Sequence, residues 1–348
     1  MNKKYNFINP GDYNLGSVLK LNNPNIFYIN HNSFANAWWE SGTVNLQFIE
    51  FLKDYRFVII DLSSEHWGDP SDNLTISVEE NLKSAGIKNF LIITHLIEDH
   101  KKTPNIVFCP TEYHTSRESF KSESIQKAQQ NLLETKIYPL SCLNNNCWPH
   151  RIYYATTIYQ KDWFDKILFT AYEIAHDNSH RPDQIVLDKN TLDIWNQIKS
   201  KYRIYFPGNI WSLDNPAYLN SYTNLAIETV VSPGVYLSEK TWKPIACGMW
   251  FLILGCPGTI AHLRSLGVDV FDDIFDHSYD LELDFFKRVD KLNQVVDNYI
   301  KKDYKSLWIK TANRRLANSK KFLDGLFDQK YLAEIKSTIE QYAPINVA

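Results

Sequence analysis

Residues 222–280 read YTNLAIETVVSPGVYLSEKTWKPIACGMWFLILGCPGTIAHLRSLGVDVFDDIFDHSYD. An apolar strand candidate carries Glu228 at its end, a helix candidate runs from Ser238 to a stop at Gly248, and a buried strand candidate covers 250–254. This strand–helix–strand order implies parallel strands joined by a right-handed crossover. The carboxyl ends of such strands share one edge of a sheet, and open α/β sheets bind ligands at that edge.

The helix candidate starts with the run Ser238, Glu239, Lys240 and Thr241. Ser238 can cap the helix, and Glu239 then lies in the first turn, where the helix dipole favours an acid. Ordinary helix-start chemistry would therefore explain the run by itself. The alternative is an anion site, because a helix N-terminus beside a lysine such as Lys240 suits phosphate.

The first half of the chain alternates between strand and helix signals. Its short apolar runs, rich in Ile, Val and Phe, are typical of strands buried on both faces, and we expect them at 25–30, 56–62, 89–96, 105–110 and 136–143. Helices are expected over 43–54 and 77–85. Ser77 and Glu80 have the spacing of a capping box at the start of the second helix.

A second strand–helix cycle starts after a join near 159–163. Strands are expected at 166–172, 203–206, 225–230 and 250–254, and helices at 238–247 and 259–266. After Asp280 the apolar residues recur at helical spacing, which predicts helices over 283–300, 304–327 and 329–342. We therefore predict an α/β protein with two Rossmann-like domains, 1–160 and 161–348, and a helical C-terminal tail.

The ordered set of Glu228, the segment SEKTWKP at 238–244 and the strand GMWFLILG at 248–255 resembles the nucleotide-sugar half of GT-B glycosyltransferases. It looks most like the glycosyltransferase-like proteins of phages and aquatic bacteria, and it is more distantly similar to the "TEK" segment of α1,3-fucosyltransferases. The resemblance covers the second half by motif and the first half by pattern. It implies transfer of a sugar from a nucleotide-activated donor to a hydroxyl acceptor, and a last helix that crosses back to the first domain.

The resemblance also implies a donor site. Lys240 would neutralise the departing diphosphate, so that no metal or other cofactor is needed beside the nucleotide-sugar co-substrate. Glu239 would face the ribose or the donor sugar, and Glu228, Ser238 and Thr241 would belong to the same donor-binding set.

A further donor contact is implied in the loop after the first strand of the second domain, where relatives carry several arginines. This chain has AHDNSHRP at 175–182, with fewer arginines. Arg181 could bind a diphosphate through paired hydrogen bonds. The other interpretation of Arg181 is an exposed loop arginine.

A catalytic base is expected after a strand of the first half. The segment DLSSEHWG at 61–68 follows the strand at 56–62, and an inverting transferase needs a base to take the acceptor hydroxyl proton. We predict Glu65 for this role, because relatives carry a similar acidic loop, followed by His66 and Asp61. Glu112 is a further candidate, and a capped polar turn is the alternative for the whole segment.

The composition limits other classes of function. The 348 residues, 44% hydrophobic and 14% aromatic, can fill two cores. A net charge of −3 argues for neither a nucleic-acid coat nor a membrane surface. The chain has no apolar run of the roughly 20 residues that a membrane span needs, no apolar signal-peptide region, and five cysteines, an odd number. We therefore expect a cytoplasmic protein, in the host cytoplasm if a phage encodes it.

Alternative functions remain at this point. The turn Gly255-Cys-Pro-Gly258 matches neither the P-loop nor the dinucleotide-binding pattern. The expected partners are a nucleotide-sugar donor and a glycan or other hydroxyl acceptor. The alternatives are transfer to a modified base of phage DNA, with a flipped base held by aromatic side chains, and a non-catalytic nucleotide-sugar-binding protein.

Overall fold

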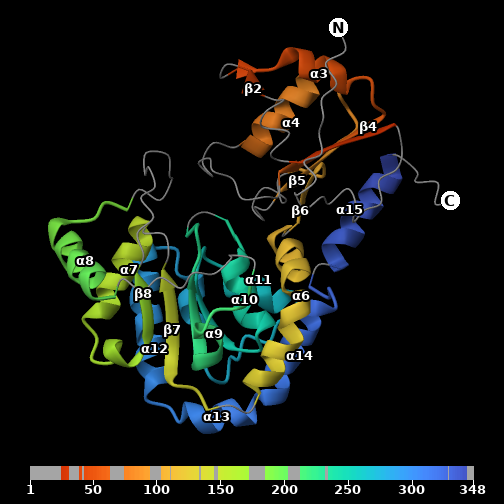
Figure 1. The fold of residues 1–348 in the computed structure, drawn as a ribbon. Helices are drawn as coiled ribbons and strands as arrows, with labels where there is room; N and C mark the ends of the chain where they lie inside the picture. The colour runs from red at the N-terminus through yellow and green to blue at the C-terminus, as the bar shows by residue number, and fades with distance from the viewer. Residues whose placement is uncertain are drawn as a thin grey trace. The chain divides into compact units, whose positions relative to one another are not determined.

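The computed structural model of the chain describes residues 25–30, 39–40, 43–62, 74–94, 103–109, 111–132, 135–144, 148–171, 185–202, 212–231, 234–327 and 329–342 (Figure 1). The chain forms two compact units, residues 1–115 with 328–348 and residues 116–327. Each unit contains a four-stranded parallel sheet with helices packed on it. The predicted α/β class with two Rossmann-like domains is therefore confirmed.

The sheet of the first unit follows the chain order. Its parallel strands are β1 (Ile26–Asn30), β4 (Phe57–Leu62), β5 (Phe90–Thr94) and β6 (Ile106–Phe108), in that order. A short antiparallel pair, β2 (Trp39–Glu40) and β3 (Thr43–Val44), precedes the helices α3 (Leu46–Leu52) and α4 (Leu74–Ser84). All six residues of β4 are buried, because a parallel sheet is covered on both faces.

Different helices pack on the two faces of this sheet. Val58 and Ile60 of β4 share a core cluster with residues of α3 and α4. Their neighbours Phe57 and Ile59 point to the other face and share a cluster with Ile335 and Ile339 of α15 (Gln329–Tyr342). The last helix thus belongs to the first unit, as the resemblance implied.

In the sheet of the second unit, the spatial order of the strands differs from their order in the chain. Its parallel strands are β7 (Tyr138–Asn144), β8 (Leu168–Ala171), β9 (Ser221–Ile227) and β10 (Trp250–Leu254), arranged as β10-β9-β7-β8. The chain passes from β7 to β8 on one side and returns to β9 on the other side. The switch point between β7 and β9 is where open α/β sheets form their binding crevice.

Helices cover both faces of the second sheet (Figure 1). On one side lie α7 (Pro149–Tyr159), α8 (Lys189–Tyr202) and α12 (Phe285–Ile300). On the other side lie α6 (Thr111–Asn131), α10 (Glu239–Ala246) and α14 (Ala312–Leu323). The shorter elements are α9 (Ala217–Asn220), α11 (Thr259–Ser265), the 3-10 helix η4 (His277–Leu281) and α13 (Tyr304–Lys310).

The boundary between the units differs from the expected one at residue 160. Strand β7 pairs with β8 and β9, so it belongs to the second sheet although it was counted with the first domain. The division falls instead after Thr115, within α6, and again after Phe327. A strand signal is local and does not reveal which strands become its neighbours.

Several helices differ from the prediction. Ser77 lies inside α4 and not at its start, so the expected capping box is wrong. The predicted helix over 304–327 is divided at Thr311 into α13 and α14. Helix α6 was not predicted, because the buried positions on it include small polar residues such as Ser116 and Ser124, which leave no apolar period.

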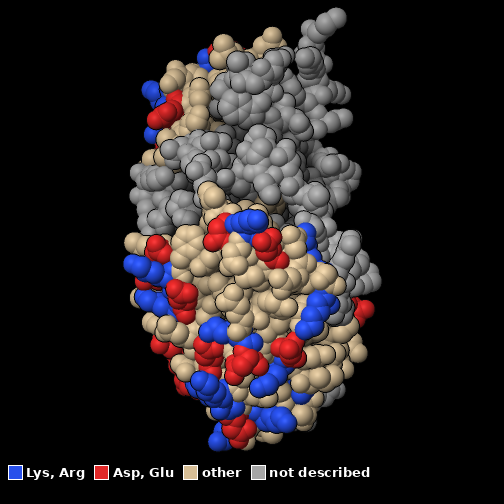
Figure 2. Space-filling model, turned by 90° about the vertical axis from the view of Figure 1, so that its left-hand side faces the viewer, with Lys and Arg blue, Asp and Glu red and all other residues tan. Residues whose placement is uncertain are grey.

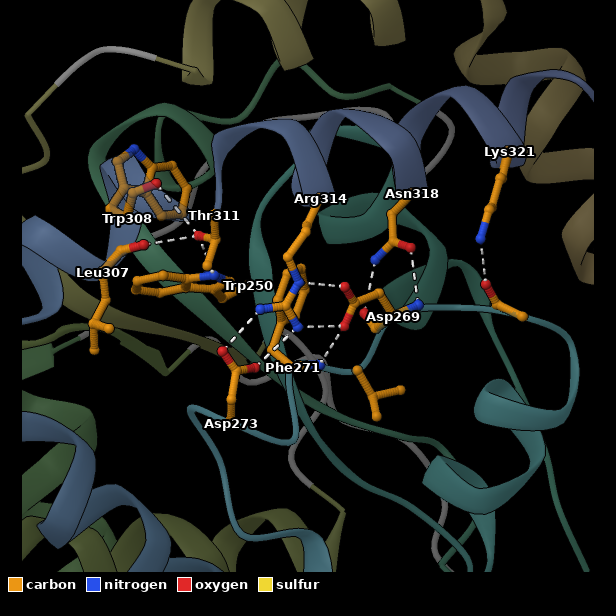
Figure 3. A network of polar contacts seen from close by, with 12 residues as sticks. Trp250, Asp269, Phe271, Asp273, Leu307, Trp308, Thr311, Arg314, Asn318 and Lys321 are labelled. Carbon is orange, nitrogen blue, oxygen red and sulfur yellow. Dashed lines mark hydrogen bonds and ion pairs between the residues drawn. The ribbon is translucent and has the colours of Figure 1, made fainter.

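An ion-pair network joins α14 to the segment after α11 (Figure 3). Arg314 donates to both carboxylate oxygens of Asp269 and of Asp273, at 2.6–2.9 Å, and lies 5.1 Å above the ring of Phe271. Phe271 has a left-handed backbone with φ 60° and is fully buried. The arginine thus holds a strained turn and neutralises two of the acids in this segment.

Gly248 allows a close approach between α10 and α6. Its φ is +63°, and a Cβ at this position would lie 3.3 Å from Cβ of Ala128. We expect Gly248→Ala to lower the free energy of unfolding by at least about 1–2 kcal/mol, the cost of the left-handed backbone. Gly267→Ala is the matched control, because its φ is +84° and a Cβ there meets nothing within 4 Å. Denaturant unfolding should show a larger loss for Gly248→Ala, and equal losses would contradict the packing argument.

In the described part of the chain, no helix combines the length and the apolar character needed to cross a lipid bilayer.

Candidate active site

The site is built around Glu228, which directly follows β9 at the switch point. The side chain is fully buried. Oε1 accepts hydrogen bonds from the backbone N–H of Ser238 at 3.2 Å and from Thr241 Oγ1 at 2.5 Å, and Oε2 accepts from Ser238 Oγ at 2.5 Å. Burial raises the pKa of Glu228, and the nearby Lys240 with the two hydroxyl donors opposes this shift. The acid is thus satisfied by donors of its own chain.

The same residues form the start of α10. Ser238 is the N-cap, and its Oγ accepts a hydrogen bond from the backbone N–H of Lys240 at 3.2 Å. Thr241, Trp242 and Ile245 are buried, so the body of the helix packs into the core of the unit. The predicted helix start at Ser238 and the strand at Trp250–Leu254 agree with the structure.

Lys240 is the cation at this helix start. Its Nζ lies 3.0 Å from Glu239 Oε1 and 3.4 Å from both Ser238 Oγ and Thr229 Oγ1, and its side chain is 30% exposed. Burial pushes the pKa of Glu239 upward, but Lys240 and Lys243 outweigh this effect and hold the pKa below its usual value. Glu239 is therefore charged near neutral pH.

A second cation approaches the same hydroxyl from α7. Arg151 Nη2 donates to Thr229 Oγ1 at 3.4 Å, and the neighbouring His150 Nε2 lies 3.0 Å from the carbonyl oxygen of Glu228. Both side chains are buried, and both lie in the first turn of α7, whose N-cap Trp148 makes no side-chain cap hydrogen bond. Thr229 thus lies between a lysine and an arginine beside a helix N-terminus, which is the chemistry of a phosphate site.

The N-terminus of the neighbouring helix α11 is capped by a carboxylate. The carboxylate of Asp280 accepts from the backbone N–H groups of Ile260 and Ala261, at 3.0 and 3.1 Å. Burial raises the pKa of Asp280, while the two N–H donors lower it. This carboxylate therefore caps the N-terminus of α11.

The structure brings together five of the predicted site residues, namely Glu228, Ser238, Glu239, Lys240 and Thr241. Glu65, His66 and Arg181 lie outside the described residues. Of the other candidates for the base, Asp61 is buried and accepts a hydrogen bond from Tyr28 OH at 2.6 Å. Glu112 belongs to the first turn of α6.

Arg151, His150 and Thr229 were not predicted from the sequence as site residues. Arg151 lies in the helix that comes after β7 in the chain, and a His-Arg pair in such a first turn is the signal that would have found it. The strand at 136–143 was assigned to the first domain, so the residues after it were not considered for the donor site.

Comparison with known proteins gave weak structural likenesses only. Neither a protein-family model nor a curated protein sequence matches this chain. Among solved structures, the chain is similar to a DNA-modifying β-glucosyltransferase determined with and without its substrate uridine diphosphoglucose, at 14% identity over 83% of this chain and 79% of that chain, with a TM-score of 0.35. It is also similar to an α1,3-fucosyltransferase, at 11% identity over 87% of this chain and 92% of that chain, with a TM-score of 0.32.

Proposed function

We propose that this protein is a glycosyltransferase that moves a sugar from a nucleotide-activated donor to a hydroxyl acceptor. The observation that carries the proposal is the convergence of Lys240 and Arg151 on Thr229 Oγ1, each at 3.4 Å, at the switch point of a parallel sheet. Two cations from different helices beside one helix N-terminus suit a diphosphate. In this proposal the diphosphate of the donor binds there.

The chemistry assigned to these residues is stabilisation of a leaving group. The acceptor oxygen bonds to the anomeric carbon, the bond from that carbon to the diphosphate oxygen breaks, and the nucleoside diphosphate leaves with the electron pair. Negative charge grows on the diphosphate, and positioned cations stabilise such charge most where water is excluded. Glu239, which is 16% exposed beside Lys240, is assigned to the hydroxyl groups of the donor.

The acceptor proton passes to a base, for which Glu65 or His66 stays our sequence-based prediction. A glycan is the favoured acceptor. On the face drawn in Figure 2, lysine and arginine side chains lie among acidic ones over the described surface. A duplex or single-stranded nucleic acid is instead held by a basic stripe.

Calorimetric titration with UDP, GDP and the corresponding nucleosides, in the presence of EDTA, tests the donor site. We expect one nucleoside diphosphate to bind more tightly than its nucleoside and to stabilise the fold by about 2.7 kcal/mol at a hundredfold excess over Kd. EDTA should not change its affinity, because protein cations supply the positive charge. Failure of both diphosphates to bind, or binding only after Mg²⁺ is restored, would contradict this site.

Turnover assays then separate transfer from binding alone. The matching nucleotide sugar should be consumed faster when small glycans are present. Transfer to hydroxymethylated DNA alone, weakened by added salt, would move the acceptor to nucleic acid. Binding without consumption of any nucleotide sugar would reduce the protein to a binding module and overturn the transferase proposal.

A further inference from the structure

The carboxylate of Glu228 is occupied by its own chain. A carboxylate offers about four lone-pair sites, and the Glu228 carboxylate accepts from one N–H and two hydroxyl groups. The side chain has no exposed surface. Because the carboxylate is fully buried, a ligand hydroxyl could reach its fourth site only by moving Ser238 or Thr241, and each of those groups would then lose its buried acceptor.

The donors to Glu228 define the first turn of α10. Ser238 is the N-cap and Thr241 is the third helical residue, with Lys240 between them. In a capping box, an acid at the third helical position accepts from the N-cap N–H. Here Thr241 occupies that position, and Glu228 supplies the carboxylate from the strand end. We call this arrangement of Glu228, Ser238 and Thr241 the clamp.

The clamp joins the two elements that form the anion site. Glu228 is followed directly by Thr229, whose Oγ1 lies 3.4 Å from Lys240 Nζ. Lys240 also donates its backbone N–H to Ser238 Oγ, the same atom that donates to Glu228. A shift of the first turn would therefore move Lys240 away from Thr229 and from the Arg151 side of the site.

We propose that Glu228 is not a donor ligand but a positioning residue, which acts through Ser238 and Thr241 to hold Lys240 at the diphosphate. The proposal rests on the proposed function of the site. It predicts that losing the clamp weakens binding of the phosphates and leaves recognition of the nucleoside unchanged.

The test measures the affinity of inorganic pyrophosphate and of uridine by calorimetry in Glu228→Ala, Thr241→Val and Glu228→Gln. We expect Glu228→Ala and Thr241→Val each to weaken pyrophosphate binding about tenfold. The double variant should lose much less than the product of the two effects, because both changes break the same clamp. Glu228→Gln should retain most of the affinity, since its amide oxygen can still accept from Ser238 N–H and Thr241.

Thr259→Val is the matched control. Thr259 is a fully buried threonine in the first turn of α11, and its Oγ1 donates to Cys256 O within its own turn at 2.6 Å. This variant makes the same chemical change outside the clamp, so pyrophosphate affinity should stay at the wild-type value. Weakened uridine binding in Glu228→Gln with unchanged pyrophosphate binding would make Glu228 a direct ligand and overturn the proposal.

The acetylation rate of Lys240 with acetic anhydride, measured by mass spectrometry, tests the clamp without any ligand. Lys240 should react several times faster in Thr241→Val than in the wild type, and Lys243 should react at the same rate in both. If the wild type binds neither UDP nor GDP, the proposed function fails, and the acetylation rates still decide whether the clamp holds Lys240. Unchanged Lys240 reactivity in folded Glu228→Ala and Thr241→Val would overturn the positioning role, even if their melting temperatures fall.

Discussion

Replacing Lys240 by alanine should weaken the binding of a nucleoside diphosphate by about 10- to 150-fold. The estimate is the effect of losing one charge-assisted contact of about 1.5–3 kcal/mol, at 1.4 kcal/mol for each factor of ten. Sugar transfer should fall to the background rate, because the departing diphosphate loses one of its cations. Calorimetry with the diphosphate and a nucleotide-sugar turnover assay would measure the two effects.

Lys243→Ala is the control for this variant. Lys243 lies in the same helix, but its Nζ lies 5.8 Å above the ring of Phe120. Its removal should lower diphosphate affinity by less than Lys240→Ala does, because Lys243 acts on the site through its charge alone, as in its effect on the pKa of Glu239. Equal losses in the two variants would mean that the diphosphate senses only the general positive charge of α10, and the assignment of Lys240 would be wrong.

The largest loss of stability is expected from Arg315→Leu. Arg315 is fully buried in α14 and donates to the carbonyl oxygens of Asn131, Leu132, Gly248 and Trp308, at 2.8–3.3 Å. Its guanidinium also lies 3.3 Å from the centre of the Trp308 ring. Asn131 ends α6, Leu132 directly follows it, Trp308 lies in the last turn of α13 and Gly248 lies two residues after α10, so one side chain links the C-terminal ends of three helices.

Removal of this side chain should lower the free energy of unfolding by at least about 3 kcal/mol, because buried carbonyls lose their charged donor. For a unit of this size the melting temperature should fall by roughly 2–4 °C for each kcal/mol. Burial lowers the pKa of Arg315 to about 9, so the side chain is still a cation near neutral pH. Differential scanning calorimetry and denaturant unfolding would measure the loss.

The adjacent residue provides the comparison. Arg314→Leu removes ion pairs to Asp269 and Asp273, but Arg314 is 38% exposed, and such pairs contribute only about 0–1 kcal/mol and are screened by salt. The loss in Arg314→Leu should therefore shrink at high salt, while the loss in Arg315→Leu should not. If Arg315→Leu is no less stable than Arg314→Leu, the helix-end carbonyls do not depend on Arg315.

The sequence alone determined the elements with strong local signals. Strand β10 and helix α15 have the predicted bounds, and α10 starts directly after Ser238. Buried strands are continuous apolar runs, and a serine cap with an acid in the first turn is a local device. The predicted site residues from Ser238 to Thr241 meet because they are neighbours in the chain. Glu228 joins them from the end of the preceding strand.

Only the tertiary structure decided which distant parts of the chain meet. Arg151 contacts Thr229 across 78 residues of sequence, and β7 belongs to the second sheet because it pairs with β8 and β9. Helix α6 buries polar side chains, so its sequence has no apolar period that would predict a helix. The contacts of Arg315 with backbone carbonyls have no sequence pattern at all. A local sequence pattern shows how a segment buries its own side chains. Strand partners and converging polar groups depend instead on the packing of the whole unit, because contact energies and not sequence spacing select them.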